Sequence, residues 1–206
     1  MNKEKIIHVI DQMAVAMEKQ KEFLTELDNV IGDGDHGINM ARGFSEVIKK
    51  RDSLAMMDAG DMIKNLGMIL VSTVGGASGP LYGTAFMKAG MFLKGKEEVT
   101  FSDFLEAFQC AIDGVKARGK AVEGEKTMLD AMLPAKRAME QEWMLSGDGK
   151  KSIEAGLTAA RKGIEYTKTI IATKGRAAYL GERSIGHQDP GATSFVFLLE
   201  AIAFQM

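Results

Sequence analysis

Three carboxylate side chains gather in one short, glycine-rich stretch near the start of the chain. They belong to Asp28, Asp33 and Asp35, and the glycines around them are Gly32, Gly34 and Gly37. If this stretch is extended, Asp33 and Asp35 project to the same side, while Asp28 approaches from the end of a preceding helix. Oxygen ligands of this kind suit Mg²⁺, which links carboxylates to the phosphates of a substrate. The cluster predicts a two-metal site that handles phosphate, because carboxylates without metals would repel it.

Other interpretations of the same stretch differ in how well they fit. An EF-hand loop counted from Asp33 would need Gly at Ile38 and Glu at Phe44, so it is excluded. Residues 32–37 match the dinucleotide fingerprint G-x-G-x-x-G, but a helical pattern precedes them and two carboxylates would face the pyrophosphate. Simple turn chemistry remains open, because Asp and Gly are common turn residues.

The glycines offer a second signal. The chain has 23 of them, concentrated in residues 32–37, 75–79, 119–124 and 175–191. In a helical protein, glycines at turns let the backbone approach a ligand closely, and four such turns could meet at one end of a bundle. The cluster at 75–79 precedes a helical pattern, so free backbone N–H groups could bind an anion there, with Ser78 adding a hydroxyl. A close helix crossing explains that cluster equally well.

Helices must position these groups, because apolar residues recur at intervals of three and four residues along most of the chain. Such runs occur around residues 6–17, 40–48 and 62–70, and further helices are predicted at about 81–93, 101–117, 128–145, 150–172 and 192–205. No comparable run shows the alternation of apolar and polar residues that is typical of a β-strand. The three prolines form no linker. We therefore expect an all-α fold of about eight helices in a single domain, residues 1–206.

Composition excludes several classes of function. The net charge of −2 and scattered Lys and Arg leave no basic footprint for nucleic acid. No run of eighteen apolar residues exists, so no membrane span is expected, and a charged N-terminus argues against a signal peptide. We expect a cytoplasmic protein. The single Cys110 excludes an internal disulfide and a cysteine zinc site.

Four blocks together resemble the nucleotide-binding L subunits of dihydroxyacetone kinases in order and spacing. These are Asp28-x4-Asp33-x-Asp35-His36-Gly37, Gly75–Pro80, Arg118-Gly119-Lys120 with Lys126-Thr127-Met128, and Gly175–Ala192. The resemblance covers essentially the whole chain. One departure is Gly34, where Ala is expected in the metal loop. The resemblance implies a barrel of eight antiparallel helices with a nucleotide, ADP or ATP, at one end.

The same resemblance assigns roles to single residues. It implies that Asp28, Asp33 and Asp35 hold two Mg²⁺ ions, and that Arg176 is catalytic. For the nucleotide it implies contacts from His36, Gly37, Ile38, Asn39, Ala77, Ser78, Gly119, Thr127, Met128, Arg176, Asp189, Pro190 and Gly191. His36 and Asn39 would lie against the phosphates and metals, and Ala77 and Ser78 would contact phosphate. Gly119, Thr127 and Met128 would line the adenine and ribose region, and Arg176 with residues 189–191 would close over the nucleotide. Whether His36 touches phosphate or only orients the carboxylates before it stays open.

The resemblance also implies a reaction shared among subunits. In the bacterial form linked to the sugar phosphotransferase system, the L subunit retains ADP as a cofactor. It accepts phosphate from a phosphohistidine of the M subunit and passes it to dihydroxyacetone on the K subunit. We expect this form, an enzyme active only with its partners. Two alternatives stay open: the L component of an ATP-dependent kinase for dihydroxyacetone or a related short ketose, and a non-catalytic nucleotide-sensing module. A homodimer is also open.

Overall fold

The computed structural model describes residues 1–205, and every regular element in that part of the chain is helical. Its elements are α1 (Lys3–Lys19), α2 (Lys21–Ile31), α3 (His36–Lys49), α4 (Arg51–Ala55), α5 (Ala59–Thr73), α6 (Ser78–Leu93), α7 (Phe101–Gly119), α8 (Leu129–Ser146), α9 (Gly149–Thr167), the 3-10 helix η1 (Arg176–Ser184) and α10 (Pro190–Ala203). The predicted all-α class is confirmed.

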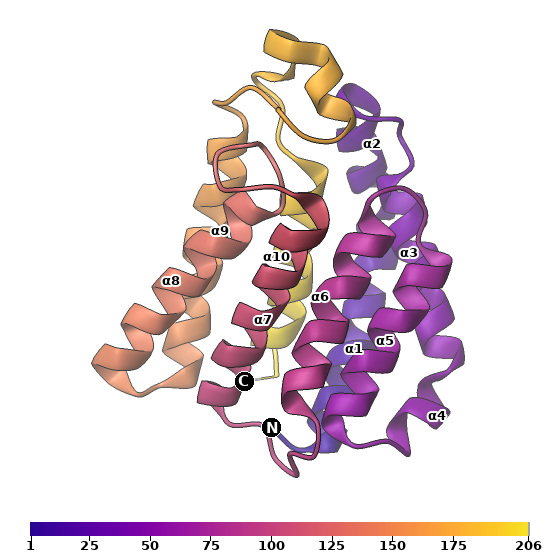
Figure 1. The fold of residues 1–206 in the computed structure, drawn as a ribbon, viewed down its shortest axis with the longest axis vertical. Helices are drawn as coiled ribbons and strands as arrows, with labels where there is room; N and C mark the ends of the chain where they lie inside the picture. The colour runs from indigo at the N-terminus through magenta and orange to yellow at the C-terminus, as the bar shows by residue number, and fades with distance from the viewer. Residues whose placement is uncertain (206) are drawn as a thin grey trace.

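Eight of these helices form a closed ring (Figure 1). In ring order they are α1, α3, α5, α6, α7, α8, α9 and α10; each contacts the next, and α10 returns to α1. Successive members run in opposite directions (Figure 1). The predicted count of about eight was low for the described chain, because α2, α4 and η1 lie between members of the ring. The helix expected at 150–172 ends at Thr167, and residues 168–175 form an irregular segment.

The ring closes around apolar side chains that the periodicity placed on one face of each helix. Helix α1 buries Ile6, Ile10, Met13 and Met17, the residues whose spacing predicted it. Burying a side chain of this size contributes about 2 kcal/mol. The interior keeps an apolar cavity of about 160 Å³. No helix among residues 1–205 is long and apolar enough to cross a membrane.

Helices α5 and α6 approach each other at backbone distance. A Cβ atom added at Gly67 would lie 2.5 Å from the carbonyl oxygen of Gly83, which is closer than atoms can approach. Any larger residue at this crossing would push the two helices apart. The crossing fixes where α6 begins, and therefore where Ser78 stands.

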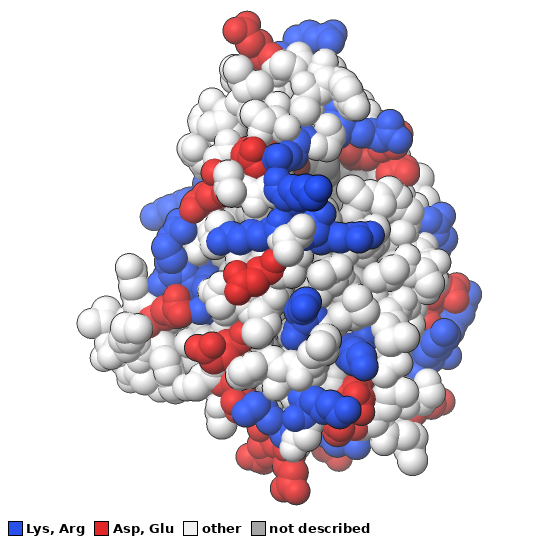
Figure 2. Space-filling model, in the orientation of Figure 1, with Lys and Arg blue, Asp and Glu red and all other residues white. Residues whose placement is uncertain are grey.

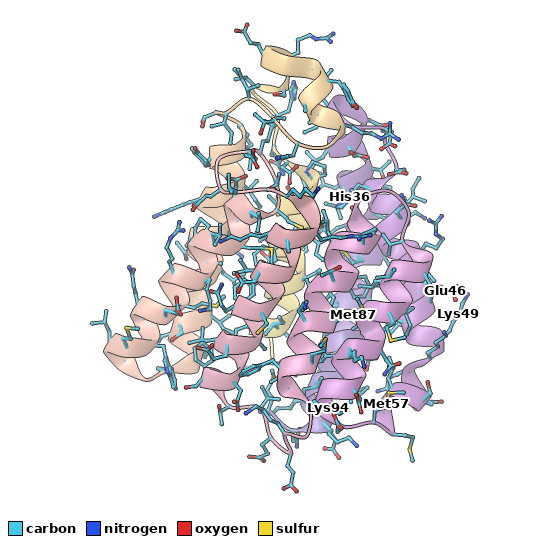
Figure 3. All side chains as sticks on the ribbon, viewed as in Figure 1. His36, Glu46, Lys49, Met57, Met87 and Lys94 are labelled. Carbon is cyan, nitrogen blue, oxygen red and sulfur yellow. The ribbon has the colours of Figure 1, made fainter. Side chains whose placement is uncertain are left out.

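The four glycine clusters lie in or beside turns at one end of the ring, as predicted. The connections before α3, α6, α8 and α10 all lie at the upper end in Figure 1. His36 is labelled near that end in Figure 3, whereas Met57 and Lys94 lie at the opposite end. The antiparallel order explains this arrangement, because every second connection returns to the same end.

Candidate functional site

The connections at the upper end enclose a cavity of about 440 Å³, within the size range of small-molecule sites. Its wall combines carboxylates, an uncapped helix start and apolar side chains. The residues that line it include Asp28, Asp33, Asp35, His36, Ala77, Ser78, Leu81, Val115, Gly119, Lys126, Thr127, Met128, Arg176, Asp189, Pro190 and Gly191. Lys and Arg side chains also gather on the surface near this end (Figure 2).

The three carboxylates lie together at one side of the cavity. One oxygen from each of Asp28, Asp33 and Asp35 falls within 4.8 Å of the others. The last turn of α2 supplies Asp28, whose Oδ2 accepts the backbone N–H groups of Asp35, at 2.9 Å, and His36, at 3.1 Å. These two bonds fold the loop back onto α2. A cluster of hard oxygen donors at this spacing fits Mg²⁺.

The loop needs its glycine at position 34. Gly34 has a φ of +73°, in the left-handed region, and an added Cβ would lie 2.0 Å from Oδ1 of Asn29. Alanine there would strain the backbone and displace Asn29. Glycine in place of the expected alanine therefore suits this loop, and it leaves all three carboxylates in place.

The start of α6 faces the carboxylates. Ala77 precedes the helix, and no side chain caps its first turn, so the first backbone N–H groups can receive an anion. An added Cβ at Gly76 would lie 3.9 Å from Oδ1 of Asp35, which places this helix start directly beside the candidate metal site. A phosphate at the helix start would therefore lie within reach of a metal ion held by the carboxylates.

His36 is engaged by serine hydroxyls on both sides of its ring. Its Nδ1 lies 2.9 Å from Oγ of Ser78, and its Nε2 lies 2.9 Å from Oγ of Ser194. Burial lowers the pKa of His36 to about 4, so the ring is neutral at pH 7. With both nitrogens occupied, the ring orients Ser78 and offers no free nitrogen to a phosphate. The ring thus bonds to serines and not to the carboxylates, and contact between His36 and phosphate stays a prediction.

One further hydroxyl group, that of Tyr82, extends this buried network. The Tyr82 hydroxyl lies 2.7 Å from Oγ of Ser194 and donates to the carbonyl of Gly191 at 3.1 Å. Burial raises the pKa of Tyr82, so the phenol stays protonated. The network joins the starts of α3, α6 and α10. Sequence reasoning missed Ser194, although a serine inside so apolar a helix was an available signal.

Part of the cavity wall is apolar. It is formed by Leu81, Val115, Ala121, Met128 and Leu129. Gly119 keeps it open, since an added Cβ would lie 3.2 Å from Cδ2 of Leu81. A flat, uncharged ring suits such a wall. Thr127 borders it, and its backbone N–H donates to Oδ2 of Asp130 at 2.7 Å.

The C-terminal segment supplies the remaining wall. Asp189 caps α10 by accepting the N–H of Ala192 at 2.6 Å, and Pro190 takes the first helical position. Burial raises the pKa of Asp189 to about 7, so this carboxyl is only partly ionised at neutral pH. Arg176 begins η1, with a largely exposed side chain whose Nε lies 2.6 Å from Oδ2 of Asp33.

Residues 30–204 match the profile of the DAK2 domain. The chain belongs to the DAK2 domain family. The resemblance that the four sequence blocks predicted is thereby confirmed. Asp28 precedes the matched stretch, but the structure places it with Asp33 and Asp35 all the same.

Relatives in the DAK2 family extend the match over nearly the whole chain. The PEP-dependent dihydroxyacetone kinase ADP-binding subunit DhaL of Escherichia coli is 42% identical over 98% of this chain and 97% of its own length. A DhaL subunit of Listeria innocua is 44% identical over 95% of this chain and 91% of its own. The L-erythrulose 1-kinase of Mycolicibacterium smegmatis is 31% identical over 96% of this chain, but over only 34% of its own length.

Solved DAK2 structures share the fold. The native dihydroxyacetone kinase of C. freundii superposes with a TM-score of 0.76 at 26% identity, over 98% of this chain. The same kinase with AMP-PNP and Mg²⁺ gives a TM-score of 0.75 at 24% identity. The present chain spans about a third of that kinase, 34% of its length.

Three of the nucleotide contacts implied by the DAK2 resemblance lie outside the cavity wall. Gly37 packs against α2, Ile38 is 45% exposed, and Asn39 accepts a bond from Arg42 at 2.6 Å. Their contacts with nucleotide stay predictions. The other ten residues expected to contact nucleotide, and the three expected to hold metal, line the cavity together. Lys126, which sequence reasoning quoted without a role, lines it as well.

Proposed function

We propose that this chain is the ADP-binding subunit of a multi-subunit dihydroxyacetone kinase. Its bound ADP would take phosphate from a phosphohistidine of an M subunit, and the γ-phosphate would pass to dihydroxyacetone on a K subunit. The observation that carries this proposal is the match to DhaL subunits along both chains, 98% of this one and 97% of the Escherichia coli one. The cavity supports it, because metal ligands, an anion-binding helix start and an apolar wall meet there.

Under this proposal, each part of the cavity wall binds a different part of the ligand. Asp28, Asp33 and Asp35 would hold two Mg²⁺ ions, which when bound neutralise phosphate charge. The N–H groups at the start of α6 and the hydroxyl of Ser78 would hold phosphate oxygens. The apolar wall beside Gly119, with Thr127 and Met128, would hold the adenine and ribose. Residues 189–191 would close over the nucleotide.

Arg176 is the proposed catalytic residue. It is the arginine nearest the carboxylate cluster, 2.6 Å from Asp33, and its exposed guanidinium can reach phosphate that enters beside them. Phosphoryl transfer depends mainly on positioning and on neutralising charge, so the reaction requires no nucleophilic side chain from this protein. The planar guanidinium suits that task, since it donates two parallel hydrogen bonds to phosphate oxygens.

A second candidate function has support of its own. The L-erythrulose 1-kinase of Mycolicibacterium smegmatis matches 96% of this chain at 31% identity. The chain could then serve as the L component of a kinase for a short ketose that takes ATP and releases ADP in each cycle. This candidate stands second because identity to the DhaL subunits is higher, 42% and 44%.

One reconstitution separates the two candidates. Purified protein is first denatured, and mass spectrometry identifies any nucleotide it retained. The protein is then incubated with dihydroxyacetone and a K subunit, once with labelled ATP and once with a phosphohistidine donor. Product formed only with the phosphohistidine donor, together with retained ADP, supports the proposed function. Product from ATP and the K subunit alone, with rapid nucleotide exchange, would support the second candidate, and no product in either arm would contradict both.

A further inference from the structure

Lys126 occupies an unusual place for a lysine. Its side chain is buried, with 1% of the residue exposed, and its backbone is left-handed at a φ of +60°. A lysine loses favourable hydration when it is buried, and a left-handed backbone costs a further 1 kcal/mol or so. Such a residue persists only where its surroundings compensate for both costs.

The ammonium group is compensated by backbone carbonyl groups. It donates to the carbonyl of Thr167, to that of Ser184 at 2.7 Å, and more weakly to that of Ile170 at 3.4 Å. Three donors therefore meet three acceptors, with no carboxylate directly bonded. The carbonyls of Thr167 and Ser184 stand at the ends of α9 and η1, where unpaired carbonyl groups favour a positive charge.

The loop that carries Lys126 is held by a different residue. Both carboxylate oxygens of Asp130 accept backbone N–H groups of this loop, one from Gly124 and the other from Thr127 at 2.7 Å. These bonds lie on either side of Lys126 in the chain. They fix the left-handed turn and aim the side chain at the carbonyl groups.

The carbonyl groups mark both ends of the segment 168–184, which carries Arg176. Thr167 precedes the segment, Ser184 ends it, and Gly186 closes its base by donating to the carbonyl of Lys168 at 2.7 Å. On the other side of the ammonium, the next residues along the chain, Thr127 and Met128, line the cavity. One side chain thus joins the wall proposed for adenine to the segment proposed to act on phosphate.

We propose that Lys126 is a positioning residue that latches the segment 168–184 against the loop 120–128. The latch keeps Arg176 over the carboxylate cluster and slows the escape of nucleotide from the cavity. This inference rests on the proposed function, since it takes ADP with Mg²⁺ as the ligand. In this proposal Lys126 touches no reacting atom. It acts on the reaction through Arg176, whose segment it holds in place.

The test compares Lys126→Met with a matched control, Lys136→Met. Methionine keeps the length and removes the donors in both variants. Lys136 is equally buried, at 3% exposure, but pairs with Glu140 along α8 and does not line the cavity. Hydrogen exchange of residues 168–186 is measured without nucleotide, and release of a fluorescent ADP is measured with Mg²⁺ present.

In Lys126→Met, exchange in residues 168–186 should rise and ADP should leave about tenfold faster, while its association rate changes little, because the loss of a latch acts on release. Lys136→Met should lose stability with neither change. Equal effects in the two variants, or none in Lys126→Met, would overturn the latch. Failure of the wild-type protein to bind ADP at all would overturn the proposed function, and the exchange measurement would still judge the latch.

A second variant and a wild-type measurement cover the case in which Lys126→Met does not fold. Lys126→Gln keeps an amide donor and should give an intermediate rate of ADP release. In the wild-type protein, acetylation by an amine-reactive reagent should spare Lys126 while it modifies the more exposed Lys174. Modification of both at similar rates would contradict the buried latch.

Discussion

Arg176 and Asp33 form an ion pair in the lining of the cavity, with Nε of the arginine 2.6 Å from Oδ2 of the aspartate. The side chains are 67% and 34% exposed, and an ion pair this accessible contributes at most about 1 kcal/mol. A divalent cation at the carboxylate cluster would therefore displace the guanidinium from Asp33 at little cost. The displaced guanidinium would then be available to the phosphate brought by the nucleotide.

The first prediction concerns the carboxylates. Asp33→Asn or Asp35→Asn should weaken ADP binding in the presence of Mg²⁺ by about 2 kcal/mol or more, because each removes a charged group that we propose as a metal ligand. Calorimetric titration of ADP measures the effect, and EDTA should mimic it. Asp52→Asn is the control, since the side chain of Asp52 is fully exposed and belongs to α4. Unchanged affinity in both cluster variants would exclude the metal assignment.

The second prediction concerns Arg176. Arg176→Lys should lower turnover in the reconstituted system about tenfold or more and leave ADP affinity nearly unchanged, because lysine cannot make the planar bidentate contact. Arg183→Lys is the matched control, an exposed arginine of the same 3-10 helix that does not line the cavity. Wild-type turnover in Arg176→Lys would remove the catalytic role.

The third prediction concerns the hydroxyl network behind His36. Ser194→Ala removes a partner from His36 Nε2 and from Tyr82, so it should lower the free energy of unfolding by about 1–3 kcal/mol. It should also weaken ADP binding, because the ring that orients Ser78 loses its anchor. Urea denaturation and ADP titration measure the two effects. Ser72→Ala, which removes an exposed hydroxyl bonded within α5, should change neither.

The fourth prediction concerns pH and Asp189. Burial raises the pKa of this carboxyl to about 7 in the folded protein, against about 3.9 when the chain is unfolded. Between these values the folded protein holds one proton more than the unfolded chain. Its free energy of unfolding therefore falls as pH rises, by about 1.4 kcal/mol per pH unit, and levels off above pH 7.

Asp189→Asn isolates this contribution, because asparagine can still cap α10 but does not titrate. Other groups titrate in the same range, His36 among them with the opposite sign, so the relevant quantity is the stability difference between the two proteins. We expect urea denaturation without metal at pH 5, 6 and 7 to show that the free energy of unfolding of the wild-type protein falls relative to that of the variant as the pH rises. A constant difference would mean that Asp189 is ionised throughout.

Much of the fold was predictable because its signals are local. The spacing of Ile6, Ile10, Met13 and Met17 predicted α1 and its buried face. Helix ends were harder to predict: the helix expected to reach residue 172 stops at Thr167, whose carbonyl is taken by Lys126 from another part of the chain. A contact of this kind leaves no periodic trace in the sequence.

The candidate site likewise combines features that depend on nearby residues with contacts between residues far apart in the sequence. The sequence by itself determined the carboxylate cluster, the glycine turns and the helices between them, because each depends on residues a few positions apart. Only the tertiary structure decided that His36 meets Ser78 and Ser194, which are 42 and 158 positions away. It also decided that Lys126 reaches the ends of α9 and η1. The physical reason is that closure of the ring brings alternate connections to one end, and the pairs that meet there depend on how whole helices pack.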